Sequence, residues 1–104
     1  MNSKRVLILI IAIMMMCSTA MAQVCKVTEY SWESGTITAS GEYVYLGGCA
    51  CDFLPMWTPI YIRGNMYIVN DRIGEDPPQF HIDVWTDSTE AANAWGVQYE
   101  EVTW

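Results

Sequence analysis

Hydrophobic positions along this chain occur in short runs, many of them alternating with polar residues, and turn residues separate the runs. The runs are rich in Val, Ile, Tyr and Trp, which favour strands, and they end at Gly, Pro, Asn or Asp, which favour turns. A hairpin signal, Arg63-Gly64-Asn65, separates two of them. This pattern predicts strands at residues 24–32, 43–46, 49–53, 60–62, 66–69, 80–85 and 97–104.

One segment carries helix signals in place of alternation. Asp87-Ser88-Thr89-Glu90 offers an N-cap followed by an acid in the first turn, Ala91–Trp95 continues the helix, and Gly96 predicts its end. Six or seven short strands with one short helix favour a closed barrel, because closure removes the edges that a small open sheet exposes. We therefore expect an all-β fold, a small β-barrel with one short helix.

The first 22 residues follow a different pattern. Lys4 and Arg5 precede the uninterrupted apolar run Val6–Met16, and Ala20-Met21-Ala22 has the form of an A-x-A cleavage site. We predict a signal peptide over residues 1–22 and a single domain over residues 23–104, secreted or periplasmic. The apolar run is shorter than the roughly 20 residues that span a bilayer, and an uncleaved anchor is the alternative.

The charge of the predicted mature chain limits its partners. Lys26, Arg63 and Arg72 are its cations, against twelve acidic residues. Nucleic acids and anionic membranes both require a basic surface, so the composition argues against either partner. Most of the acidic residues are expected to serve solubility.

Three cysteines remain after the predicted cleavage, Cys25, Cys49 and Cys51, an odd number for an oxidising compartment. Either Cys25 pairs with one of the other two, or all three are small buried core residues. The chain has one histidine, His81, and no C-x-x-C spacing, so the sequence predicts no metal site and no cofactor.

Three aspartates stand in or directly after predicted strands, namely Asp52, Asp71 and Asp83. Strand ends of a small barrel can bring such carboxyl groups together, and neighbouring carboxylates raise one another's pKa values, which favours a general acid. The alternative is that they cap turns by accepting backbone N–H bonds. Among the aromatic residues, Trp57 lies on a predicted exposed loop between two prolines, where its ring could stack on a sugar.

The order of short motifs resembles a known family over residues 27–102. The motifs are Val27–Ser31, Thr38–Gly41, Ala50–Asp52, Leu54-Pro55, Ile60–Ile62, Val69–Gly74, His81–Trp85, Glu90–Ala92 and Trp95–Val97. They resemble the 3D domain, named for three aspartates and found in exported bacterial cell-wall proteins and some phage proteins. Between Arg72 and Gln79 the chain differs from the family, with an acidic loop containing two prolines in place of glycines.

The resemblance implies a double-psi β-barrel and peptidoglycan chemistry like that of the A-type lytic transglycosylases. These enzymes cleave the MurNAc–GlcNAc β-1,4 bond without water and leave a 1,6-anhydro product. By resemblance, Asp83 is the catalytic acid and base, and Asp71 and Asp52 line the same groove. Thr38 and Ser40 are expected to hydrogen-bond the substrate or a carboxylate, His81 is expected to contact the substrate, and no cofactor is implied.

Two other functions fit the same residues. The motif His81-Ile82-Asp83 is also similar to one in wall-loosening proteins of the expansin kind, which bind glycans without cleaving them. In that case an exposed strip of Trp and Tyr is expected. A structural or lysis-associated protein that has lost activity is the third possibility, and there the loop at residues 75–78 would fill the groove. Peptidoglycan glycan strands at the cell wall are the expected partner in the first two cases.

Overall fold

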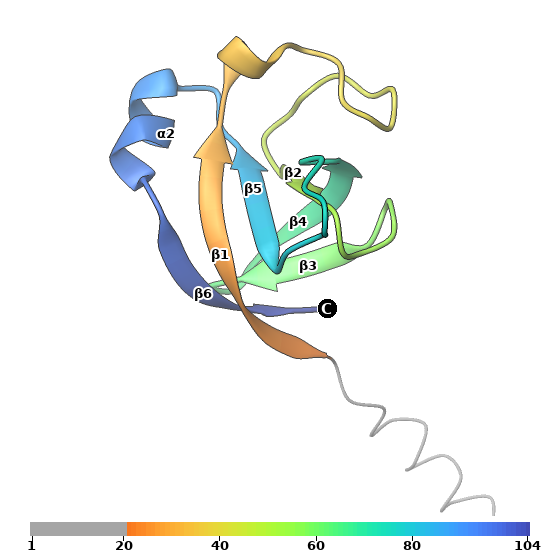
Figure 1. The fold of residues 1–104 in the computed structure, drawn as a ribbon. Coiled ribbons are helices and arrows are strands. Elements are labelled where there is room, and N and C mark those ends of the chain that lie inside the picture. Colours follow the sequence, from red (N-terminus) through yellow and green to blue (C-terminus); the bar gives the residue numbers. More distant parts are fainter. Residues whose placement is uncertain (1–20) are drawn as a thin grey trace, which may run out of the picture.

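The computed structural model describes residues 21–104, so the predicted signal peptide lies almost entirely outside the described residues. Within them the chain forms six strands, one short 3-10 turn and one helix (Figure 1). In chain order these are β1 (Ala22–Tyr30), η1 (Trp32–Ser34), β2 (Gly48–Cys51), β3 (Pro59–Ile62), β4 (Asn65–Asp71), β5 (His81–Trp85), α2 (Thr89–Trp95) and β6 (Gln98–Thr103).

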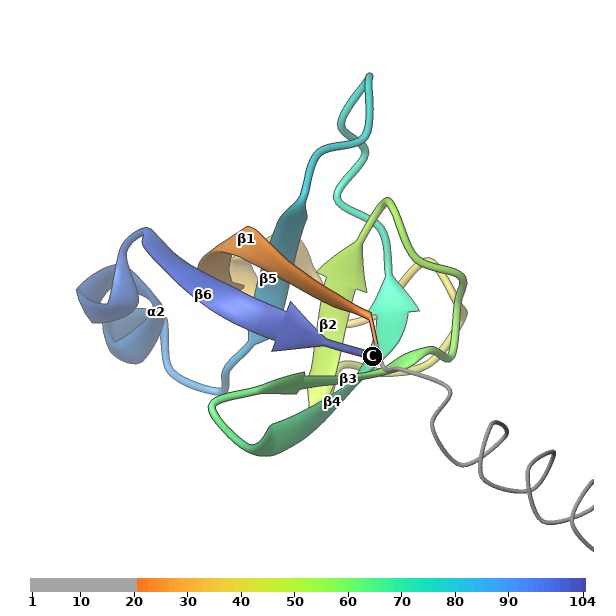
Figure 2. The same cartoon turned by 90° about the horizontal axis from the view of Figure 1, so that it is seen from below.

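The strands close into a barrel in the order β1-β5-β2-β4-β3-β6, with β6 pairing back onto β1. The β1–β5 and β2–β4 pairs are parallel and the other four pairs are antiparallel. Figure 2 shows β1 and β6 crossing one side of the barrel, with β3 and β4 along another. The prediction of a small all-β barrel with one short helix is confirmed.

The strand predicted at residues 43–46 is wrong. This segment lies in the long connection between β1 and β2, where the described contact is an isolated bridge between Ile37 and Tyr43. Gly41 and Gly47 adopt positive φ on either side of it, which bends the chain away from a ladder. Leu46 remains exposed, so the apolar run does not mark a core strand.

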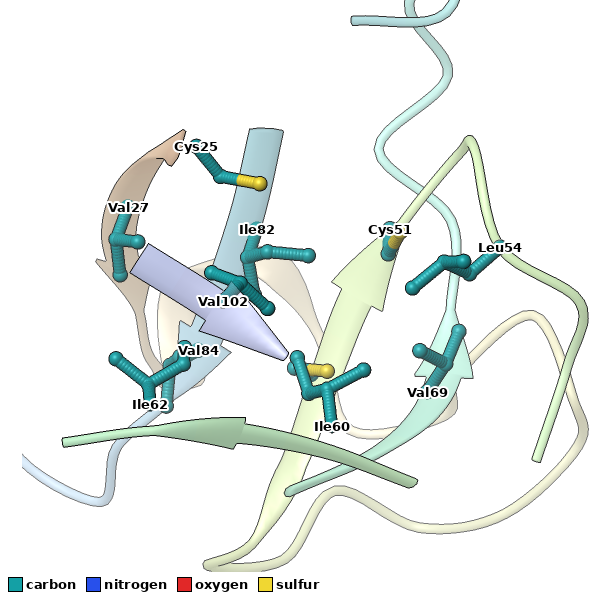
Figure 3. Close-up of a cluster of buried hydrophobic side chains, with 11 residues drawn as sticks. Cys25, Val27, Cys51, Leu54, Ile60, Ile62, Val69, Ile82, Val84 and Val102 are labelled. Carbon is teal, nitrogen blue, oxygen red and sulfur yellow. The ribbon is translucent and has the colours of Figure 1, made fainter. Parts of the chain in front are cut away.

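The barrel interior takes every second residue of each strand. These side chains point toward one another in Figure 3, and Ile60, Ile82, Val69 and Val102 are fully buried. Full burial of such a side chain contributes roughly 1.5–3 kcal/mol, so this cluster supplies much of the stability of a small domain. Alternation therefore leaves the other half of each strand for the outer face.

Cys25, Cys49 and Cys51 belong to this interior and are all free. Burial raises the pKa of Cys25 to about 11 and that of Cys49 to about 12, with the neighbouring Cys51 adding to both shifts. The thiols therefore stay protonated at neutral pH and pack as small apolar groups. Of the two alternatives for the cysteines, the structure has the buried one.

Helix α2 closes one end of the barrel. Its N-cap is Ser88, whose side chain accepts from the N–H of Ala91 at 3.0 Å, and Gly96 ends it with a φ of 66°. The indole Nε1–H of Trp95 donates to the carbonyl of Val27 at 3.0 Å, which ties the helix to β1. In the part of the chain described here, no helix has the length and apolar character needed to cross a membrane.

Candidate active site

One row of residues crosses four neighbouring strands on the outer face of the barrel. The ladder pairs Thr28 with Asp83, Asp83 with Ala50, and Ala50 with Asp71. Their sequence neighbours, such as Val27 and Ile82, point inward, so these four side chains point outward. Ala50 between the two aspartates leaves open space, since its strand separates their backbones by about 10 Å.

A register shift in β4 places Asp71 in this row. β2 pairs Cys49 with Val69 but the next residue, Ala50, with Asp71, so that Asn70 is the extra residue of a bulge. Without the bulge Asp71 would share the inward face of Val69, because side chains alternate along a strand. Asn70 itself is 1% exposed and packs against Gly48. The bulge thus turns a carboxyl group from the core to the outer face.

A cavity of about 270 Å³ opens above this row. Its floor is Ala50, its two acidic walls are Asp71 and Asp83, and the remaining lining residues are Tyr30, Ser34, Ile37, Arg72 and Ile73. A second depression of about 370 Å³ lies between Arg63, in the turn after β3, and Glu100 on β6, and its lining includes none of the predicted site residues. We therefore take the cavity with both aspartates as the candidate active site.

Asp83 is the acidic group of this cavity with the raised pKa. Burial is the largest cause, and the negative charges of Asp71 and Glu75 add to it. The hydroxyl of Thr28 donates to Asp83 Oδ1 at 2.9 Å, and this bond and the nearby His81 offset part of the rise. A raised pKa at a cavity wall is what a general acid requires at neutral pH.

Asp71 has a different environment from Asp83. Its Oδ1 accepts from the backbone N–H groups of Ala39 at 2.8 Å and Arg72 at 2.9 Å, and its Oδ2 accepts from the phenol of Tyr30 at 3.1 Å. Burial and the adjacent Asp71 raise the pKa of Tyr30, so the phenol remains a donor. Through these bonds Asp71 anchors the β1–β2 connection to the cavity.

Asp52 lies outside the lining of the cavity and closes a turn. Its Oδ1 accepts from Ile73 N–H at 2.8 Å, its Oδ2 accepts from Glu75 N–H at 2.7 Å, and Gly74 N–H lies 3.0 Å from both oxygens. Burial raises the pKa of Asp52, but these bonds and the nearby Arg72 outweigh it and lower the pKa overall. The structure therefore brings Asp71 and Asp83 together, whereas Asp52 shapes the loop that follows β4.

The residues expected to contact substrate are dispersed. Thr38 and Ser40 bond each other at 2.8 Å, and it is the backbone N–H of Ala39 between them that reaches Asp71. Trp57 is 53% exposed on its loop, as predicted, but is not among the cavity-lining residues. His81 is buried behind Asp83, with Nε2 at 2.7 Å from Thr28 Oγ1 and Nδ1 at 3.1 Å from Glu75 Oε1.

Sequence reasoning missed three residues that touch the two aspartates or His81. Thr28 and Tyr30 occupy alternate positions of β1, and this alternation was the available signal that they share the outer face. Nothing in the sequence pairs β1 with β5, however, so their contact with Asp83 and Asp71 was not predictable. Glu75 lies in the acidic loop at residues 72–79 and reaches His81 because Asp52 folds that loop back.

The fold and the cavity define a class of protein: a small β-barrel with two carboxyl groups in different environments on its outer face. The chain matches no known family model and no curated protein. Residues 21–104 contain no group of three or more His, Cys, Asp or Glu side chains arranged to hold a metal ion.

Proposed function

We propose that this protein is an exported lytic transglycosylase that cleaves peptidoglycan glycan strands at MurNAc–GlcNAc β-1,4 bonds. The observation that supports it best is the carboxyl group of Asp83, whose pKa is raised at the wall of a cavity. The second carboxyl group, Asp71, faces the same cavity and accepts three hydrogen bonds. Two carboxyl groups in different environments on one cavity are an arrangement suited to glycoside cleavage.

The proposed reaction uses Asp83 twice. Its protonated carboxyl donates to the glycosidic oxygen as the C1–O4 bond breaks, and positive charge develops on the MurNAc ring. The resulting Asp83 carboxylate then takes the proton of the C6 hydroxyl of the same sugar, and O6 bonds to C1. The nucleophile is internal, so no second carboxylate is needed to activate water, in contrast to ordinary glycoside hydrolysis.

Asp71 supports this reaction by electrostatics. Its charge lies across Ala50 from Asp83, where it stabilises the positive charge that develops on the sugar. The same charge contributes to the raised pKa of Asp83. Asp52 acts at a distance by holding the loop at residues 73–75, which carries part of the cavity wall.

A second candidate is a glycan-binding protein without catalysis, of the wall-loosening kind. One observation favours it: the exposed aromatic Tyr43 pairs with Ile37, which lines the cavity, and so lies near the cavity rim. The inactive-scaffold alternative has less support. It requires the loop at residues 75–78 to fill the groove, and none of these residues lines the cavity.

A digest of purified peptidoglycan, read by mass spectrometry, tests the proposal. Protein expressed from the full chain should release 1,6-anhydro-muropeptides, and Asp83→Asn should lower their release at least 100-fold, the lower end of a general acid's contribution. Asp76→Asn, an exposed aspartate in the neighbouring loop, is the matched control and should keep full activity. Binding without any anhydro product would replace the proposal with the non-catalytic alternative.

A further inference from the structure

Four side chains form one continuous hydrogen-bonded chain that ends at Asp83. Glu75 Oε1 lies 3.1 Å from His81 Nδ1, His81 Nε2 lies 2.7 Å from Thr28 Oγ1, and Thr28 Oγ1 lies 2.9 Å from Asp83 Oδ1. The chain crosses from the loop at residues 72–79 to β5, then to β1 and back to β5. The proposed reaction uses Asp83 alone and assigns no task to the other three residues.

Counting hydrogens shows what this chain holds. Three contacts within hydrogen-bond distance need three hydrogens, one in each contact. The Thr28 hydroxyl supplies one, and a neutral imidazole at His81 supplies a second. If Glu75 and Asp83 were both carboxylates and His81 were neutral, one contact would lack a hydrogen and two lone pairs would face each other. The observed distances therefore fit a chain that holds one additional proton.

The additional proton can sit at either end or in the middle with every contact kept. On His81, both ring nitrogens donate, to Glu75 and to Thr28, and Thr28 donates to Asp83. On Asp83, the carboxyl donates to Thr28, Thr28 donates to His81 Nε2, and Nδ1–H still donates to Glu75. Passing between these two states moves the Nε2 proton to Thr28 and the Thr28 proton to Asp83, so atoms and charge balance at each step.

The two ends of the chain differ in their contact with solvent. The Glu75 side chain is 30% exposed, whereas His81 is 10% exposed and Asp83 faces the cavity that the substrate would fill. A bound glycan would separate Asp83 from bulk water on the cavity side. The hydrogen-bonded chain then leaves a route to solvent along the same face of β5, through His81 and Glu75.

We propose that Glu75, His81 and Thr28 form a proton-holding chain that supplies Asp83 with the proton of its acid form, with Glu75 as the positioning residue at the solvent end. This inference rests on the proposed function in that it takes Asp83 as the acid. Other titratable or charged groups also face Asp83 or its cavity. Asp71, Arg72 and Tyr30 line the cavity, whereas Glu29 on β1 and the interior thiol of Cys49 on β2 lie close enough to interact with the charge of Asp83.

Glu75→Gln would remove the need for the additional proton without changing the shape of the side chain. Its amide can donate to His81 Nδ1, so the ring donates from Nε2 to Thr28 and Thr28 donates to Asp83 as a carboxylate. All three contacts then close without the additional proton. Glu75→Gln also removes a negative charge that favours protonated Asp83. Both consequences shift Asp83 toward its carboxylate form, so activity should be lost at lower pH than in the wild type.

The test is nuclear magnetic resonance of the ring nitrogens of His81. The protein contains one histidine, so a [¹⁵N]histidine sample gives one pair of signals. Protein from the full chain is titrated from pH 4 to 9 as wild type, Glu75→Gln, Thr28→Val and Thr28→Ser. We expect Glu75→Gln to lower the pH at which the ring loses its charge by about one unit. Asp83→Asn, made with Thr28 unchanged, should also displace the ring titration, because His81 and Asp83 share a proton.

The Thr28 pair distinguishes a proton chain from simple packing. Thr28→Val keeps the shape but removes the hydroxyl, so in that background Asp83→Asn should displace the ring titration by less, through the charge of Asp83 alone. Thr28→Ser keeps the hydroxyl and should restore the displacement. An unchanged ring titration in Glu75→Gln, or an equal response to Asp83→Asn with valine and with threonine, would overturn the proposal. Thermal unfolding of each variant confirms that it is folded.

The outcomes also separate this inference from the proposed function. In the digest assay, Glu75→Gln should move the alkaline limb of the pH profile for anhydro product to lower pH, while Asp76→Asn leaves it in place. If Glu75→Gln forms anhydro product with an unchanged pH profile and an unchanged ring titration, the transglycosylase proposal is retained and the proton-holding chain is rejected. A coupled ring titration without any anhydro product would retain the chain and reject the transglycosylase.

Discussion

Asp52→Asn should destabilise the protein through the loop that Asp52 holds. The substitution keeps the shape of the side chain but replaces one acceptor oxygen with an NH2 group. In its better orientation the amide oxygen stays at Oδ1, where it accepts from Ile73 and Gly74. The NH2 group then faces the N–H of Glu75, which loses a 2.7 Å bond and meets a second donor.

The magnitude follows from the bonds that are lost. A hydrogen bond to a charged group contributes about 1.5–3 kcal/mol, so we expect the free energy of unfolding to fall by about 2 kcal/mol at pH 7. For a domain of this size each kcal/mol corresponds to about 4–8 °C, so Tm should fall by roughly 8–16 °C. Urea and thermal unfolding followed by tryptophan fluorescence measure both quantities.

The pH dependence gives a sharper test than the size of the effect. The pKa of Asp52 is lowered from 3.8 in the folded protein, so its stabilisation is complete above pH 3.8 and is lost as pH falls through the folded value. Wild type and Asp52→Asn should therefore converge in stability as pH falls through the folded pKa of Asp52. Asp76→Asn on the same loop should change stability by less than about 0.5 kcal/mol. A difference that persists unchanged at pH 2, or equal effects of both variants, would refute this account of the loop.

Two further substitutions test the outer row and the bulge. Asp83→Asn should raise the free energy of unfolding at pH 7, measured in urea. The reason is that the raised folded pKa of Asp83 makes the wild-type protein less stable as pH rises above 3.8. No gain in stability, or a gain that remains at pH 3, would contradict the assignment. Gly48→Ala should cost about 1–3 kcal/mol, because its Cβ would lie 2.8 Å from Asn70 Nδ2 beside the bulge, and thermal unfolding that matches the wild type would show that Asn70 moves freely.

The fold could be predicted because the signals that specify it are local. Period-two alternation, the hairpin signal at Arg63-Gly64-Asn65 and the caps of α2 each lie within a few residues. The false strand at residues 43–46 has the same composition as a true one. The false strand differs from a true one in the bends at Gly41 and Gly47. It also makes only an isolated bridge in place of a strand pair, and pairing is a tertiary property that the local residue pattern does not reveal.

The site was less predictable because it depends on register. The sequence singled out Asp71 and Asp83, but their meeting requires β5 and β4 to flank β2 with Ala50 between them. It also requires the extra residue Asn70, and a bulge has no signature in the local alternation. Thr28 was overlooked for the same reason, since its contact with Asp83 spans 55 positions of the chain.

The two carboxyl groups of the cavity can be assigned different tasks from their surroundings alone. Asp71 accepts hydrogen bonds from two backbone N–H groups and a phenol. Burial raises the pKa of Asp83, the charge of Asp71 adds to the rise, and the hydroxyl of Thr28 and His81 offset part of it. Asp83 is therefore the carboxyl group that we assign as the acid. The proton needs a donor group to reach it, and the hydroxyl of Thr28 connects Asp83 to His81 and Glu75 in the structure.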